Sequence, residues 1–179
     1  MRKNVQFHWD AEQQDAFDKL KTALTSAPVL GTVRSEGTLY MDTDASDLGL
    51  GIVLSQDQDG EERVLAYASR TPTAPKRVYS VTRKELLAVV YGLKHFRQYL
   101  IGRKFVIRSD HAALQWLRRT PEPMAQAGRW LAIMEEFEFT VQHRAGSKHQ
   151  NAGALSRRPS TEAELTDGDE SHSVRENGK

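Results

Sequence analysis

The order of β-favouring and helical segments constrains the fold of this 179-residue chain more than any other feature. Three short β-favouring runs follow one another with brief connections, over residues 37–46, 48–54 and 63–68. The segment Asp57–Gly60 is a turn signal between the second and third runs. Runs spaced this closely predict an antiparallel meander of three strands.

The hydrophobic pattern is helical from Thr82 to Leu100 and predicts one long helix, with Gly102 as the stop signal. Further along, the pattern predicts strands over 104–109 and 139–142, and helices over 111–118, 125–137 and 152–156. Trp116 and Trp130 sit among apolar helical positions and are expected in the core. Strands and helices in this order predict an α/β architecture with one mixed sheet.

The two ends of the chain differ in character. Asp10 and Gln13 form a capping-box pattern, which predicts a helix that ends at Ala27-Pro28. Residues 159–179 are polar and charged with almost no apolar side chains, which predicts a disordered tail.

Composition excludes several classes of protein. The chain has no cysteine, which rules out disulfides, zinc ribbons and cysteine nucleophiles, and its net charge is only +1. A nucleic-acid partner would therefore need a local basic patch. No run approaches the roughly 18 apolar residues of a membrane span, and no secretory signal is visible, so we expect an intracellular protein with no membrane partner.

Three acidic residues occupy positions suited to a metal site. Asp44 ends the first predicted strand, Glu85 lies early in the long helix on the face of Val89, and Asp110 ends the strand over 104–109. If the first and fourth strands are neighbours, Asp44 and Asp110 emerge side by side. Converging carboxylates need a cation, and hard oxygen ligands suit Mg²⁺ or Mn²⁺. Two such ions about 4 Å apart support phosphodiester hydrolysis.

Each acid also has a purely structural explanation. Glu85 follows Thr82 by three residues and could complete a capping box, whereas Asp110 could cap the next helix. Asp44 could be a turn residue. Asp42 shares a strand face with Asp44 and either assists a metal site or, more simply, is an exposed acid at a strand end.

Local motifs distinguish between these explanations. They are, in order, Thr43-Asp44-Ala45-Ser46, residues 50–56, Ala66-Tyr67-Ala68-Ser69-Arg70, residues 84–88, residues 93–97, residues 102–105, Ser109-Asp110-His111 and Ala154-Leu155-Ser156-Arg157. In order and spacing, the chain resembles the RNase H-like domain of gypsy-type (long-terminal-repeat) retrotransposon reverse transcriptases, part of a Pol polyprotein. The resemblance runs from about Phe7 to Pro159.

The resemblance implies a fold, a domain layout and an activity. The fold would be α/β and RNase H-like, a five-stranded mixed sheet flanked by helices, over residues 33–158. Residues 1–32 would be the connection segment after the polymerase, and 159–179 the tail. The activity would be that of an endonuclease that hydrolyses the RNA strand of RNA–DNA hybrids. Asp44, Glu85 and Asp110 would be catalytic and would bind two Mg²⁺ ions, with Mn²⁺ as a substitute.

One position departs from the family pattern. The family's Ala-Asp-Ala-Leu-Ser-Arg string reads Ala152-Gly153-Ala154-Leu155-Ser156-Arg157 here, so Gly153 leaves the fourth-ligand position vacant. Loss of even an indirect metal contact costs ~10–100-fold in affinity or activity. The alternative to an impaired nuclease is therefore a catalytically weak or inactive remnant that binds nucleic acid or acts structurally. A third alternative is an unrelated α/β module that Mg²⁺ neither binds nor stabilises.

Partners follow from the same resemblance. An RNA–DNA hybrid would contact basic side chains, for which the candidates are Arg70, Arg83, Lys84, Lys94, Arg97, Arg103 and Lys104, unless these form only a solvated basic face. His143 or His149 could shuttle a proton, although a surface histidine without a role is the simpler explanation. No Tyr-x-Asp-Asp string and no cysteine is present, so the polymerase centre and the zinc-binding start of the integrase would lie elsewhere in the polyprotein.

Overall fold

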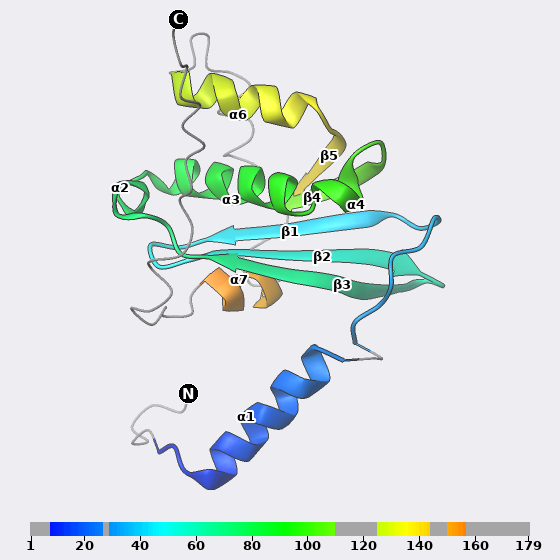
Figure 1. The fold of residues 1–179 in the computed structure, drawn as a ribbon, viewed down its shortest axis with the longest axis vertical. Helices are drawn as coiled ribbons and strands as arrows, with labels where there is room; N and C mark the ends of the chain where they lie inside the picture. Colours follow the sequence, from blue (N-terminus) through cyan, green and yellow to red (C-terminus); the bar gives the residue numbers. More distant parts are fainter. Residues whose placement is uncertain (1–7, 27–28, 110–124, 144–149, 157–179) are drawn as a thin grey trace, which may run out of the picture.

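The computed structural model describes residues 8–26, 29–109, 125–143 and 150–156, which form a mixed sheet with helices on both faces (Figure 1). The strands are β1 (Leu39–Ala45), β2 (Leu50–Gln58), β3 (Glu61–Arg70), β4 (Lys104–Ser109) and β5 (Glu138–His143). Their order across the sheet is β3-β2-β1-β4-β5. The first three strands are antiparallel, whereas β4 runs parallel to β1 and β5 parallel to β4. The predicted five-stranded mixed sheet and its antiparallel meander are both confirmed.

Within the described residues, helices pack on both faces of the sheet. Helix α3 (Val81–His95) packs on β1 and β2, and α6 (Ala125–Glu135) lies over α3. On the opposite face the short helix α7 (Gln150–Ser156) contacts β1, β2 and β3 (Figure 1).

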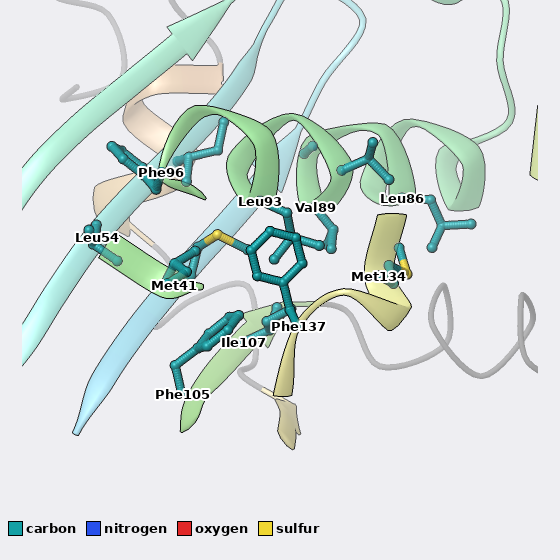
Figure 2. Close-up of a cluster of buried hydrophobic side chains, with 14 of the residues drawn as sticks. Met41, Leu54, Leu86, Val89, Leu93, Phe96, Phe105, Ile107, Met134 and Phe137 are labelled. Carbon is teal, nitrogen blue, oxygen red and sulfur yellow. The ribbon is translucent and has the colours of Figure 1, made fainter. Parts of the chain in front are cut away.

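The hydrophobic core lies between the sheet and α3 (Figure 2). Strand residues alternate between faces, so Met41 and Ile107 point toward α3, where Leu86, Val89 and Leu93 meet them. Trp130 and Met134 of α6 extend the core, which confirms the prediction for Trp130. Trp116 and the predicted helix over 111–118 lie outside the described residues.

The close approach of α3 to the sheet depends on a glycine. A Cβ atom at Gly92 would lie 2.8 Å from the sulfur of Met41 and 3.2 Å from a methyl carbon of Ile52. A side chain at this position would therefore push the helix away from β1 and β2.

The prediction of one continuous helix over 82–100 is wrong, because the structure has two helices there. Helix α3 ends at His95, and a separate short helix, α4 (Arg97–Leu100), follows. Phe96 lies between them with a ψ of 17° and is buried to 2% exposure, so its side chain is fixed in the core while the chain changes direction toward β4. A further short helix, α2 (Ala74–Arg77), occupies part of the predicted loop over 71–75.

Helix α1 (Ala11–Leu24) stands away from the sheet (Figure 1). Its predicted capping box is present, with Asp10 accepting from Glu12 N and Gln13 accepting from Asp10 N. No residue of α1 is buried, and Phe17 and Leu20 are 45% and 65% exposed. After α1, Leu30 forms an isolated bridge with Val64 of β3, and Gly31 N donates to the carbonyl of Val64. Within the described ranges, no helix has the length and apolarity needed to cross a membrane.

Candidate active site

Two of the predicted acids, Asp44 and Asp110, stand in the sequence at the end of β1 and directly after the end of β4. In the parallel register Asp42 lies opposite Arg108, so β1 and β4 are neighbours, which was the condition for Asp44 and Asp110 to emerge side by side. Asp44 lies two residues further along β1, near its C-terminal end. Asp110 follows Ser109, the last residue of β4, and lies outside the described residues.

Asp44 is held by a side chain from the opposite end of the sequence. It belongs to the strand and is half-buried, so the turn explanation is wrong. Its Oδ2 atom accepts a hydrogen bond from the Ser156 hydroxyl of α7. The same hydroxyl lies 3.1 Å from the carbonyl oxygen of Gly153. One buried serine therefore links the acid to the backbone of the helix.

Glu85 is buried on the sheet-facing side of α3, as predicted. It is 8% exposed, and its Oε2 atom is buried. The alternative capping-box role is wrong because the N-cap of α3 is Ser80, whose hydroxyl accepts from Arg83 N at 3.4 Å. A carboxylate on an otherwise apolar helix face is costly to bury, which is typical of a functional group.

Helix α7 lies directly on the backbone of β2. A Cβ atom at Gly51 would fall less than 3.0 Å from Ala152 O and Ser156 N, and one at Gly49 less than 3.0 Å from Ser156 O. Glycine at these two positions is therefore required for the helix to sit where it does.

Two serines of the sheet satisfy the last carbonyls of α7. Ser46 Oγ donates to Ser156 O at 2.5 Å, and Ser69 Oγ donates to Leu155 O at 3.1 Å. These carbonyls have no partner within the helix itself, so the two hydroxyls fix where α7 ends.

Gly153 lies in the middle of this fastened helix. The residue is buried, and its position supplies no side-chain oxygen. Helix α7 nevertheless keeps its hydrogen bonds to β1 and β3. The absence of a carboxylate at position 153 is therefore compatible with the intact fold.

Asp42 is fully buried, so the expectation of an exposed strand-end acid is wrong. The reason is the register: Arg108 lies beside it and donates to Asp42 Oδ2 at 2.7 Å. Arg108 Nη1 also donates to Glu62 Oε2 at 2.8 Å, and its guanidinium lies 4.4 Å from the centre of the Tyr40 ring. Burial alone would lower the pKa of Arg108, but the hydrogen bond with Glu62 and the charge of Asp42 raise it overall.

The predicted basic residues are spread over several elements, and most of them make contacts within the protein. Arg103 donates to the carbonyls of Arg34 and Ser35 at 2.9 Å, and Lys104 pairs with Glu138 at 2.9 Å. These contacts hold Arg103 and Lys104 at the end of the sheet where β1 begins, away from Asp44.

The remaining predicted basic residues lie on α3 or on elements near it. Arg83 lies over the ring of Tyr79 and donates to Gln126, and Arg70 lies 5.7 Å from the ring centre of Tyr91. Lys84 is buried and pairs with Asp47, and Arg97 pairs with Glu136. Lys94 is exposed. Burial of Lys84 contradicts its placement on a solvated basic face. Contact of these residues with nucleic acid stays a prediction.

The predicted acids fit a hard divalent cation in kind, although Asp44 contacts α7 on one face of the sheet and Glu85 belongs to α3 on the other. Asp44 and Glu85 supply carboxylate oxygens, the ligands that Mg²⁺ prefers. Across the described ranges, no group of three or more His, Cys, Asp or Glu side chains could hold a metal ion. Asp110, which the sequence places in the same set, is outside those ranges.

Sequence reasoning missed four residues that support the site: Ser156, Asn151, Arg108 and Glu62. Ser156 stood within a quoted motif but had no assigned role. The available signal for Arg108 was a lone arginine after the apolar run Phe105-Val106-Ile107. A charge inside a buried strand needs a partner, and here that partner is Asp42.

Comparison with solved structures defines the fold. The chain is similar to the foamy viral protease–reverse transcriptase dRH in complex with double-stranded DNA, with a TM-score of 0.65 and 20% identity over 89% of this chain and 30% of that one. It is also similar to the foamy viral protease–reverse transcriptase in complex with an RNA/DNA hybrid, with a TM-score of 0.59 and 21% identity over 90% of this chain and 21% of that one. The sheet and its helices therefore form an RNase H-like fold.

Comparison of sequences then shows the family. Residues 9–107 match the profile of the RNase H-like domain found in reverse transcriptase. The retrovirus-related Pol polyprotein from transposon 297 of Drosophila melanogaster is 40% identical over 146 residues, which cover 82% of this chain and 13% of that protein. The transposon Tf2-3 polyprotein of Schizosaccharomyces pombe is 35% identical over 162 residues, covering 88% of this chain and 12% of that protein. The chain belongs to the family of RNase H-like domains of reverse transcriptases, and it spans only about an eighth of these polyproteins' length.

Proposed function

We propose that this chain is the RNase H domain of a gypsy-type long-terminal-repeat retrotransposon reverse transcriptase, an endonuclease that hydrolyses the RNA strand of RNA–DNA hybrids. The observation that carries the proposal is the burial of Glu85 in α3, which packs on the strand that presents Asp44. Polyprotein relatives and a structural neighbour solved with an RNA/DNA hybrid support it.

Asp44, Glu85 and Asp110 would hold two Mg²⁺ ions, for which Mn²⁺ can substitute. When bound, the ions would supply an activated water and stabilise the leaving oxygen of a phosphodiester. The chain's own contribution is placement. Ser156 fixes one oxygen of Asp44, and the packing of α3 fixes Glu85, so neither carboxylate needs to be ordered when the substrate arrives.

A second candidate is a catalytically weak or inactive domain that binds nucleic acid or has a structural role. The observation that favours it is Gly153, which provides no ligand although α7 remains seated on the sheet. In either case the proposed partners are an RNA–DNA hybrid and the polymerase domain of the parent polyprotein. The domain would act inside the cell, in the cytoplasm, the nucleus or a retroelement particle.

Cleavage of a labelled RNA–DNA hybrid tests the proposal, with Mg²⁺ or Mn²⁺ and with the chain as it stands beside Gly153→Asp. We expect Gly153→Asp to cut at least about ten-fold faster because it restores a ligand. Asp44→Asn, placed in the Gly153→Asp background, should abolish that cleavage and is the matched control.

The outcomes separate the two candidates. Cleavage by both proteins supports a nuclease that tolerates glycine, whereas cleavage by Gly153→Asp alone identifies a disabled nuclease. If neither protein cuts or binds Mn²⁺, the assignment of the site is wrong.

A further inference from the structure

A polar network centred on the buried side chains of Asp42 and Arg108 lies next to the residues of the proposed site. In each of three elements, the network residue stands two positions before a position of the site. Asp42 stands two residues before Asp44, and Arg108 two residues before Asp110. Asn151 stands two residues before position 153. On a strand, a step of two residues returns to the same face, so Asp42 and Asp44 share the face that α7 covers.

The network joins all three elements at one carboxylate oxygen. Asp42 Oδ2 accepts from Arg108 Nη2 at 2.7 Å and lies 3.3 Å from Asn151 Nδ2. Arg108 comes from β4 and Asn151 from the first turn of α7. Glu62 of β3 pairs with both Nη1 and Nη2 of Arg108, so the network spans the sheet from β3 to β4.

Net stability does not explain why these charges are buried. Asp42 is 0% exposed and Arg108 is 7% exposed. Removing two charges from water costs about as much as their attraction returns, and well-packed apolar residues often serve as well or better. Placement of other groups is a role that apolar side chains could not fill, because they are not directional.

The geometry of α7 indicates what is placed. Its first turn is linked to Asp42 through Asn151, and its last turn is linked to Asp44 through Ser156. Both acids belong to β1, so the helix is fastened to one strand at two points. A shift of α7 at the Asn151–Asp42 hydrogen bond would therefore also move Ser156, which holds Asp44.

We infer that Asp42, Arg108 and Asn151 are positioning residues that set the register of β1, β4 and α7 and thereby orient the metal-binding carboxylate of Asp44. The metal-binding part of this inference rests on the proposed function. The hydrogen bonds between β1 and α7 are formed by the chain itself, without a metal. Asp42 and Arg108 act through hydrogen bonds of fixed direction, and their charges matter less for this role than those hydrogen bonds do.

Two variants distinguish the effect of the hydrogen bonds at Asp42 from the effect of its charge. Asp42→Asn keeps an acceptor oxygen for both Arg108 and Asn151 but removes the charge. The double variant Asp42→Val/Arg108→Met replaces both charges with apolar side chains and removes the hydrogen bonds that Asp42 accepts from Arg108 and Asn151. Asn151→Ala removes two hydrogen bonds of an exposed side chain, the one that Asn151 Nδ2 donates to Asp42 and the one that its Oδ1 accepts from Ala152 N. This milder variant keeps the test decisive if the double variant does not fold.

The measurement is Mn²⁺ affinity of the full chain, from titration with electron paramagnetic resonance of free Mn²⁺, together with amide hydrogen exchange of residues 151–156. We expect Asp42→Val/Arg108→Met to weaken Mn²⁺ binding about 10–100-fold, and Asn151→Ala about ten-fold. Both should exchange faster in α7, whereas Asp42→Asn should stay close to the parent in both readouts.

A buried polar residue elsewhere in the sheet provides the control. Gln56 is 0% exposed and binds the carbonyls of Arg34 and Glu36 at the other end of β2. Gln56→Leu should lower the melting temperature without changing Mn²⁺ affinity or exchange in α7.

Parent-like Mn²⁺ affinity in both Asn151→Ala and the double variant would overturn the inference. If neither the parent nor Gly153→Asp binds Mn²⁺, the proposed function fails instead, and hydrogen exchange alone decides the positioning role. In that case, unchanged protection of α7 in both variants overturns it, and faster exchange supports it.

Discussion

The hydroxyl of Ser156 donates a hydrogen bond to Oδ2 of Asp44, which joins the last residue of α7 to the end of β1 across 112 positions of sequence. Ser156 is fully buried, and Asp44 is half-buried. The orientation of this acid therefore depends on a helix that is distant in sequence but packs directly on β1. Any change that moves α7 should be felt at Asp44.

Ser156→Ala should lower the free energy of unfolding by about 1.5–3 kcal/mol, because hydrogen bonds to charged groups are worth that much and Asp44 loses its donor. Urea denaturation followed by circular dichroism measures the change. Ser69→Ala is the matched control, since Ser69 also bonds α7 but at an exposed, uncharged acceptor. A loss no larger than that of Ser69→Ala would contradict the assigned strength of the Ser156 link.

Gly51→Ala should displace α7 and cost about 1–3 kcal/mol, the usual penalty of overpacking. The added methyl group would lie against Ala152 O and Ser156 N, neither of which can move without the helix. Thermal unfolding gives the stability, and amide exchange in α7 shows where it is lost.

Gly128→Ala is the opposite case in the same chain. Gly128 lies within α6, and an added Cβ would meet open space. Alanine there should raise stability by about 0.5–1 kcal/mol through helix propensity alone. If Gly51→Ala were as harmless as Gly128→Ala, the close contact between α7 and β2 would be disproved.

Local sequence signals predicted the sheet, the burial of Glu85 and the strand position of Asp44 for a physical reason. Hydrophobic periodicity records which side of each strand and helix is buried, and Glu85 could be placed on the sheet side of α3 from its spacing to Val89. Asp44 was identified from a short motif on a single strand. These features depend on neighbours within a few residues.

What the sequence did not predict depends on distant partners. Burial of Asp42 requires Arg108, which is 66 positions away, and nothing within β1 reveals that partner. The link from Ser156 to Asp44 likewise joins the two ends of the domain. The break at Phe96 follows from how the core holds its ring, which helical periodicity alone cannot encode.

Deletion of residues 1–26 should change the free energy of unfolding by no more than about 0.5 kcal/mol, the range of surface changes. Helix α1 buries none of its residues, and Leu30 and Gly31, which follow it, contact Val64 of β3. Urea denaturation of the shortened and full chains tests this. A loss of several kcal/mol would mean that α1 belongs to the folded unit, against the predicted connection segment over 1–32.

Lys94→Ala should weaken binding of an RNA–DNA hybrid and reduce the slope of log K against log salt by about one, because each phosphate contact releases roughly one counterion. Lys94 is the clearest test among the predicted basic residues, since it is exposed, whereas Lys84 and Arg97 are held in ion pairs. Fluorescence anisotropy at several salt concentrations, without divalent metal, measures the slope. Lys19→Ala on α1 removes the same charge far from the sheet and should leave the slope unchanged. Equal slopes for the parent and Lys94→Ala would show that the hybrid does not reach the end of α3, and the interface would then have to lie nearer Arg83.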